Sequence, residues 1–129
     1  MNKETEYKLN ELVIRISKNR KVAAIFLFGS AVTGRMREDS DIDIGVLMKD
    51  ASDDEENGIY GYGNEKFEVH SFNKLPLEIQ FRILRDGRLL LIKNKDFLKF
   101  TWLKVVKNYL DFEPFISNFY RKIIKNAWC

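Results

Sequence analysis

The fold of this 129-residue chain is decided by one stretch, FGSAVTGRMREDSDID, which spans residues 28–43. It begins at the end of an apolar run, residues 22–28, whose length and content favour a buried strand over a helix. It ends in a second apolar stretch, residues 41–48, that alternates like a strand. The pattern therefore predicts a strand, a sharp turn, a short helix at 31–36, a polar loop and another strand.

The Gly29-Ser30 pair lies at the predicted turn. Gly29 allows the backbone to turn sharply, and without a side chain it lets a phosphate approach the main chain closely. Ser30 offers its hydroxyl and its amide at a helix N-terminus, where N–H groups and the helix dipole favour anions. We therefore interpret Gly29 and Ser30 as residues that bind the triphosphate of a nucleotide.

The Asp41-Ile42-Asp43 segment carries two carboxylates on one face of the second strand, because side chains alternate between the faces of a strand. Such a pair is electrostatically costly unless a cation lies between them. Mg²⁺ prefers oxygen ligands and is commonly bound by one or two carboxylates together with substrate phosphates. Two ions, Mg²⁺ or Mn²⁺, would activate an attacking hydroxyl and stabilise leaving pyrophosphate. Asp41 and Asp43 are therefore predicted metal ligands and catalytic residues.

A third strand is predicted at residues 66–72, with Glu68 and His70 on one face. The residues expected on its other face are Phe67, Val69 and Ser71. Glu68 is the candidate for a third catalytic, metal-binding carboxylate, with a solvated strand glutamate as the alternative. His70, the only histidine, is assigned a solvent-facing or packing role, because metal-assisted transfer needs no histidine.

Two residues near the turn are further candidates for binding the nucleotide. Arg35 follows the turn, and arginine pairs well with phosphate oxygens. A solvated loop charge is an equally good interpretation of Arg35. Ser40 closes the polar loop directly ahead of Asp41 and is included as a nucleotide-binding candidate.

Hydrophobic periodicity predicts helices at 6–19 and 77–85, the second ended by Asp86-Gly87, and a short strand at 89–92. Residues 49–64 lack such periodicity and are predicted to form a mobile connection. Two amphipathic helices are expected near the C-terminus, one starting at residue 96 and one at 115–128 after Pro114. The predicted fold class is α+β, a small mixed β-sheet packed by helices in a single domain, 1–129.

Composition excludes several classes of protein. Apolar residues make up 45% and charged residues 32%, which is typical of a folded globular chain. The balance of 22 basic against 19 acidic residues is too even to indicate direct nucleic-acid binding. The single Cys129 allows no internal disulfide, and no apolar run approaches the roughly 18 residues of a membrane span. We expect a cytoplasmic protein that does not bind a membrane.

The motif of Gly29-Ser30, ten intervening residues and Asp41-x-Asp43 resembles that of the minimal nucleotidyltransferases in the DNA polymerase β-like superfamily. The resemblance extends to FEVHSFNKLP at 67–76 and LRDGRLL at 84–90. The segment KNYLDFEP at 107–114 is similar to the branch that serves as antitoxin in HEPN/MNT toxin–antitoxin pairs. Together the resemblance covers residues 25–120. The family most often has Asp at its third acidic position, where this chain has the longer Glu68.

This resemblance implies a polymerase β-like nucleotidyltransferase fold and a protein adenylyltransferase that moves AMP from ATP to a tyrosine of a HEPN-domain toxin. The C-terminal helices, about 96–128, are rich in aromatic residues, so we expect them to pack on the domain and contact the partner. Two alternatives stay open. One is a non-catalytic antitoxin that inhibits its partner by contact. The other is nucleotide transfer to a small molecule such as an aminoglycoside, although those enzymes usually add a second domain.

Overall fold

A computed structural model describes residues 1–35 and 40–128, without the side chains at 113–117, 119–120 and 123–128. Its centre is a four-stranded sheet in the order β3-β2-β1-β4. The strands are β1 (Val22–Phe28), β2 (Ile42–Met48), β3 (Phe67–Ser71) and β4 (Arg88–Ile92). β1 is antiparallel to both β2 and β4, whereas β2 and β3 are parallel. The mixed sheet and the α+β class are as predicted.

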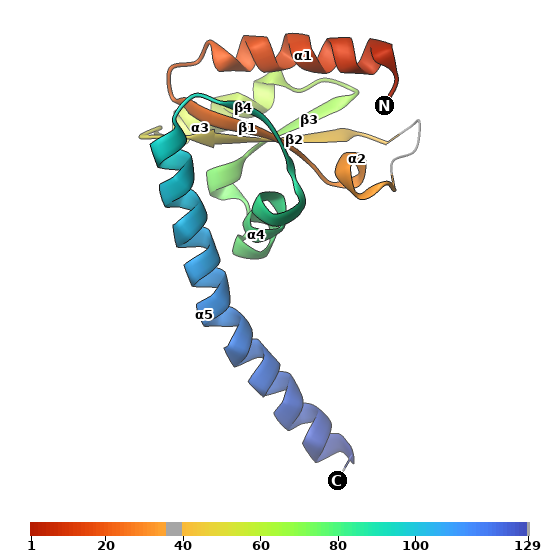
Figure 1. Ribbon diagram of the computed structural model, residues 1–129, viewed down its shortest axis with the longest axis vertical. Helices are drawn as coiled ribbons and strands as arrows, with labels where there is room; N and C mark the ends of the chain where they lie inside the picture. The colour runs from red at the N-terminus through yellow and green to blue at the C-terminus, as the bar shows by residue number, and fades with distance from the viewer. Residues whose placement is uncertain (36–39, 129) are drawn as a thin grey trace.

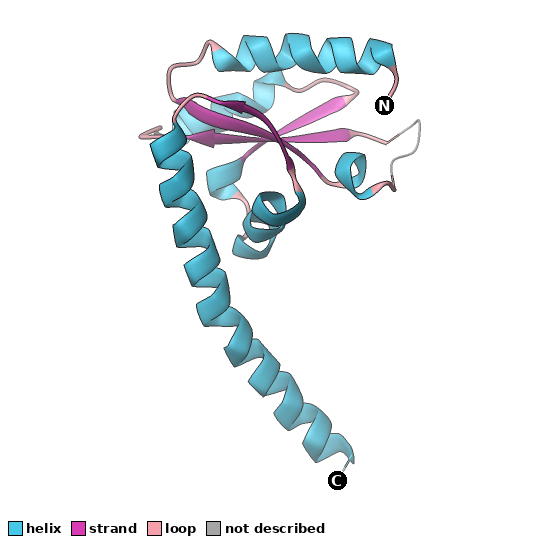
Figure 2. Cartoon of the chain, viewed as in Figure 1, coloured by secondary structure: helices cyan, strands magenta, loops and turns pink. Residues whose placement is uncertain are grey.

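Helices cover both faces of this sheet. α1 (Lys3–Ser17) lies along one face, and α4 (Leu77–Asp86) and α5 (Lys95–Trp128) lie on the other (Figure 1). Figure 2 shows the same arrangement coloured by secondary structure. Asn2 caps the N-terminus of α1, because its side-chain oxygen accepts a hydrogen bond from Thr5 N at 2.8 Å. The sheet is thus the middle layer between two helical layers.

Strand alternation decides which residues of β2 enter the core. Ile42, Ile44 and Val46 are fully buried in the cluster that packs beneath α1. Asp43 has the opposite parity and points to the face that carries α4 and α5. The predicted split of β2 into an apolar face and a carboxylate-bearing face is therefore confirmed, although β2 begins at Ile42, one residue after Asp41.

The prediction of a mobile connection at 49–64 is wrong. The segment contains α3 (Asp53–Gly58) followed by a 3₁₀ helix, η1 (Ile59–Tyr62). Ser52 caps α3 in a reciprocal pair: its hydroxyl accepts from Glu55 N at 3.2 Å, and the Glu55 carboxylate accepts from Ser52 N at 3.1 Å. Ile59 is buried in the α1-side core. Helices this short contain too few turns to produce a hydrophobic period.

The prediction of two C-terminal helices is also wrong, because α5 is one helix of 34 residues that includes Pro114. A proline inside a helix removes one backbone hydrogen bond, and neighbouring turns can carry the helix past that gap. Near its start α5 packs on the domain, with Val105 buried and the Tyr109 ring stacked on Phe81 at 3.9 Å between centroids. Figure 1 shows the rest of α5 extending away from the sheet.

The short helix after the first strand is α2 (Ser30–Thr33), which is earlier and shorter than the predicted 31–36. Its last expected residue, Met36, lies outside the described residues. In the part of the chain that the structure describes, none of the helices combines the length and apolarity needed to span a bilayer.

The cap of α3 gives the first prediction. Ser52→Ala removes the hydroxyl that accepts from Glu55 N, so it should lower the free energy of unfolding by about 1 kcal/mol. Ser52→Asp keeps an acceptor at the same position and should retain most of that stability. Urea unfolding followed by circular dichroism measures both variants. Equal unfolding midpoints for Ser52→Ala and the wild type would show that the cap does not stabilise this segment.

Candidate active site

Two acidic side chains meet on the sheet because β2 and β3 pair in a fixed register. Asp43 lies directly opposite Glu68, and Gly45 lies opposite His70. Residues paired across neighbouring strands point to the same face, so both carboxylates and the imidazole are on the side of α4. Like charges directly opposite each other destabilise a sheet, so this register favours a cation at the site.

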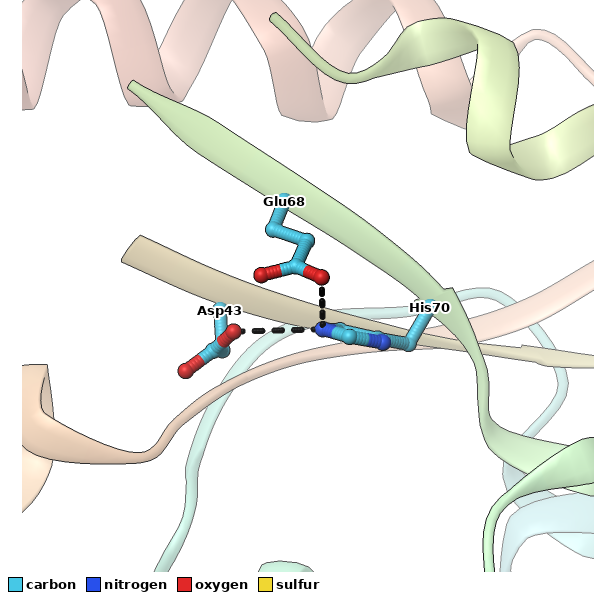
Figure 3. A group of neighbouring side chains, drawn as sticks. All are labelled: Asp43, Glu68 and His70. Atoms are coloured by element: carbon cyan, nitrogen blue, oxygen red, sulfur yellow. Dashed lines mark hydrogen bonds and ion pairs between the residues drawn. The ribbon is translucent and has the colours of Figure 1, made fainter. Parts of the chain in front are cut away.

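His70 completes this cluster. Its Nε2 atom lies 3.1 Å from Asp43 Oδ1 and 3.8 Å from Glu68 Oε1, as Figure 3 shows. One potential ligand atom from each of the three residues lies within 4.8 Å of the others. The assignment of His70 to a solvent-facing or packing role missed this contact. The sequence did indicate that His70 shares a face with Glu68. It did not indicate that β2, with Asp43, is the strand beside His70, because only the fold shows which strands pair.

The environment of His70 favours its protonated form. The hydrogen bond to Asp43 raises the pKa of His70 above its ordinary value, the charges of Glu68 and Asp43 add to this, and partial burial opposes it. The Phe28 ring lies against the imidazole, with ring centroids 5.5 Å apart. In the absence of a cation, an imidazolium would therefore offset the repulsion between the two carboxylates.

The Gly29 turn lies against the same cluster. Gly29 has φ +75° and ψ −147°, a backbone conformation that residues other than glycine rarely adopt. A Cβ atom at Gly29 would lie 2.5 Å from Asp43 Oδ2, well inside van der Waals contact. The absence of a side chain thus allows the phosphate-binding turn predicted from the sequence to contact the predicted metal ligand directly.

Ser30 opens α2 and is half-buried. The amides of Val32 and Thr33 donate to the Gly29 carbonyl at 3.1 and 3.3 Å, which closes the turn. The first amides of a helix have no acceptor within that helix. In α2 these first amides are the N–H groups of Ser30 and Ala31. The arrangement matches the predicted anion-binding turn, and the role of Ser30 in binding phosphate stays a prediction.

The remaining predicted residues lie around the cluster. Asp41 directly precedes β2 and is exposed, and among the described residues it is not part of the group formed by Asp43, Glu68 and His70. Arg35 is exposed beyond α2. The Ser40 carbonyl accepts a hydrogen bond from Lys66 Nζ at 3.1 Å, which joins the end of the loop to the start of β3. The ligand roles of Asp41, Arg35 and Ser40 stay predictions.

A small hollow adjoins the turn between α2 and α4, with a volume of about 250 Å³. Phe28, Val32, Ile79 and Ile83 give it apolar walls, and Gly29 lies at its edge. Its volume is below the roughly 300 to 1,000 Å³ of pockets that enclose a whole drug-sized ligand. It therefore suits one ring of a larger ligand.

The donor set fits a divalent cation. Two carboxylates and one imidazole supply oxygen and nitrogen ligands that divalent ions accept, and the positive end of a helical turn lies beside them. An arrangement of this kind can hold a cation and an anionic phosphate chain next to each other, which is what nucleotide chemistry requires.

Comparison with known proteins agrees with this geometry. Residues 10–96 match the family described as polymerase beta, nucleotidyltransferase. No curated protein sequence matches the chain. Three similar solved structures come from toxin–antitoxin complexes, all with low sequence identity, so the likeness concerns the fold.

One of the three is a toxin–antitoxin complex with AMP-PNP, 17% identical, with TM-score 0.67, covering 88% of this chain and 97% of that one. Another is the toxin–antitoxin MntA-HepT, 16% identical, with TM-score 0.66, covering 95% and 99%. The third is a tri-AMPylated Shewanella oneidensis HEPN toxin in complex with MNT antitoxin, 17% identical, with TM-score 0.63, covering 96% and 99%.

The contact between Gly29 and Asp43 gives a prediction with a matched control. Gly29→Ala should displace the Asp43 carboxylate and lower the affinity for ATP with Mg²⁺. Gly34→Ala is the control, because Gly34 has a similar φ of +77° but open space at its Cβ position. Gly34→Ala should lose roughly 1–2 kcal/mol of stability as a left-handed alanine, and Gly29→Ala should lose more, because ψ of −147° places Gly29 outside the left-handed helical region. Titration calorimetry should show weakened binding for Gly29→Ala only; equal affinities would contradict the contact.

The cluster also predicts the titration of His70 in EDTA. Because His70 is the only histidine, its ring gives one set of NMR signals. Its midpoint should lie above the ordinary value of about 6.5 and should fall in Asp43→Asn, which removes the largest cause of the shift. The resulting stabilisation is complete below the ordinary pKa and is lost as pH rises through the raised pKa. A midpoint unaffected by Asp43→Asn would show that the two side chains do not interact in solution.

Proposed function

The chain belongs to the polymerase β nucleotidyltransferase family, and we propose that it is an antitoxin that transfers AMP from ATP to a hydroxyl, most simply a tyrosine hydroxyl, of a HEPN-domain toxin. The observation that carries this proposal is the convergence of Asp43 and Glu68 on one face of the sheet, directly beside the Gly29 turn. A metal-binding pair and a phosphate-binding turn in contact are the two parts that nucleotidyl transfer needs.

In this proposal each part of the site binds one part of the nucleotide. The Gly29 backbone and the Ser30 hydroxyl and amide hold the triphosphate, with Arg35 and Ser40 as further contacts. The apolar hollow beside Gly29 takes the base. Asp41, Asp43 and Glu68 hold Mg²⁺, for which Mn²⁺ can substitute. Bound Mg²⁺ would neutralise the triphosphate and lower the pKa of the acceptor hydroxyl.

The transfer itself is a substitution at the α-phosphorus. The acceptor oxygen forms a bond to the α-phosphorus. The bond between the α-phosphorus and the oxygen that bridges it to the β-phosphate breaks, and pyrophosphate leaves with that electron pair. The acceptor proton is released. The residues of this chain orient the triphosphate at the Gly29 turn, so that the incoming hydroxyl and the leaving pyrophosphate can be in line.

A protein acceptor suits the exposed surface of α5. Phe100, Leu103 and Leu110 recur at helical spacing on one side of this helix, and each is more than half exposed. The opposite side packs on the domain through Val105 and Tyr109. An exposed apolar stripe of this kind is typical of a protein interface. Docking there would orient the acceptor without a second domain, and the similar folds come from complexes with toxins.

The mass of the partner tests this function. The chain is incubated with a candidate HEPN-domain partner, ATP and Mg²⁺, and the intact mass of that partner is measured. Each transferred AMP should add one fixed increment to the mass of the partner. EDTA should abolish the transfer, because the carboxylates then hold no cation. Asp43→Asn should lower transfer by several orders of magnitude. Asp54→Asn, which removes the same charge from an exposed position on α3, should have no effect.

Two outcomes would contradict the proposal in different ways. A partner that is fully inhibited but unmodified, also with Asp43→Asn, would favour inhibition by contact. An unmodified, active partner together with nucleotide transfer to an aminoglycoside would favour a small-molecule acceptor.

A further inference from the structure

We propose that His70 is itself a ligand of the bound cation, and that its nitrogen makes the site prefer Mn²⁺ to Mg²⁺. The inference rests on the proposed function, because it concerns the cation of the same site. It assigns to His70 a role in binding and specificity that the carboxylate motif alone does not contain.

The distances within the cluster are close to those between ligands that share one ion. Nε2 of His70 lies 3.1 Å from Asp43 Oδ1 and 3.8 Å from Glu68 Oε1, and the three ligand atoms lie within 4.8 Å of one another. For metal–ligand bonds of about 2.1 Å, octahedral geometry separates neighbouring ligands by ~3 Å and opposite ligands by ~4 Å. The three atoms therefore need only small shifts to surround one cation, and the proton on Nε2 is released to solvent as the metal–nitrogen bond forms.

The sheet also fixes the direction of the imidazole. His70 lies opposite Gly45 in the β2–β3 register, and a Cβ at Gly45 would meet the Phe28 ring, which itself packs against the imidazole. The ring extends over β2 toward the Asp43 carboxylate (Figure 3). Phe28 packs against the ring, with centroids 5.5 Å apart, and the His70 side chain is only 21% exposed. Nε2 is thus held toward the carboxylates by packing as well as by its hydrogen bond.

The chemistry of the donors indicates which ion gains from this arrangement. Mg²⁺ is a hard cation that takes oxygen ligands and keeps several waters. Imidazole nitrogen suits first-row transition ions, and Mn²⁺ accepts carboxylates and imidazole in similar octahedral geometry. A site with two carboxylates and one imidazole therefore stabilises Mn²⁺ relative to Mg²⁺, in comparison with a site made of carboxylates alone.

A purely structural role of His70 makes a different prediction. If the imidazole only separates the carboxylates when no ion is bound, it will move aside on metal binding, and no metal–nitrogen bond will form. Loss of His70 would then change stability in EDTA and leave the preference between Mn²⁺ and Mg²⁺ unaltered. A spectroscopic measurement of the metal–nitrogen bond separates the two roles.

The test uses Mn²⁺ as the probe, in pulsed electron paramagnetic resonance of the full chain. Nitrogen-14 coupled directly to Mn²⁺ should be visible in the wild type. It should be replaced by the nitrogen-15 pattern when the protein is labelled with ¹⁵N-histidine, since only one histidine is present. The signal should disappear in His70→Gln, which removes the nitrogen donor. Bound Mn²⁺ without nitrogen coupling, or coupling that does not change with ¹⁵N-histidine labelling, would overturn the inference.

A competition experiment measures the preference. In His70→Gln, the concentration of Mg²⁺ that displaces half of the Mn²⁺ should fall roughly tenfold relative to the wild type, because even supporting partners of ligands alter metal affinity by about 10- to 100-fold. Circular dichroism in EDTA checks that the variant is folded, and the isotope experiment on the wild type stands if it is not. An unchanged competition ratio in a folded variant would overturn the preference.

These results are independent of the transfer assay. Nitrogen coupling together with no transfer to any acceptor would contradict the proposed function and leave His70 as a ligand. Transfer of AMP with no nitrogen coupling would contradict the role of His70 and leave the function intact.

Discussion

The parallel pairing of β2 with β3 is the constraint on which the rest of the molecule depends. Its register sets Asp43 opposite Glu68 and Gly45 opposite His70 on one face of the sheet. Two carboxylates in directly opposed positions repel each other, so the arrangement costs stability unless positive charge is near. In the described structure the His70 imidazole lies between them, and the same position suits a divalent cation. The candidate site is therefore a consequence of strand pairing.

Parallel pairing also explains the segment between the two strands. A chain that leaves β2 must return along the sheet before it can run parallel in β3, which needs a connection of a dozen or more residues. α3 and η1 form this connection, and Ile59 anchors it in the core beneath α1. On the opposite face, α4 forms one wall of the hollow beside Gly29. Both faces of the sheet thus carry a hydrophobic core, and the face of α4 also carries the candidate site.

The helix α5 has two roles that follow from its length. Its first turns pack on the domain through Val105 and the stacked rings of Phe81 and Tyr109. Its apolar stripe of Phe100, Leu103 and Leu110 remains exposed. A domain of this size would bury such side chains if the fold allowed it, because their burial is favourable. Their exposure agrees with the docking of a protein acceptor that the proposed function requires.

The sequence by itself determined the elements with a clear period or strong local chemistry. Strand alternation separated Asp43 from Ile42 and Ile44, and Gly29 marked the turn. The sequence did not reveal α3, because this helix has a local cap but the packing of its segment depends on residues far away in the chain. The sequence also did not reveal that α5 continues through Pro114. The contact of His70 with Asp43 was decided only by the tertiary structure, because these residues are 27 positions apart and their distance depends on which strands pair and in which register. Alternation fixes the face of a side chain, and only the pairing of strands fixes its neighbours.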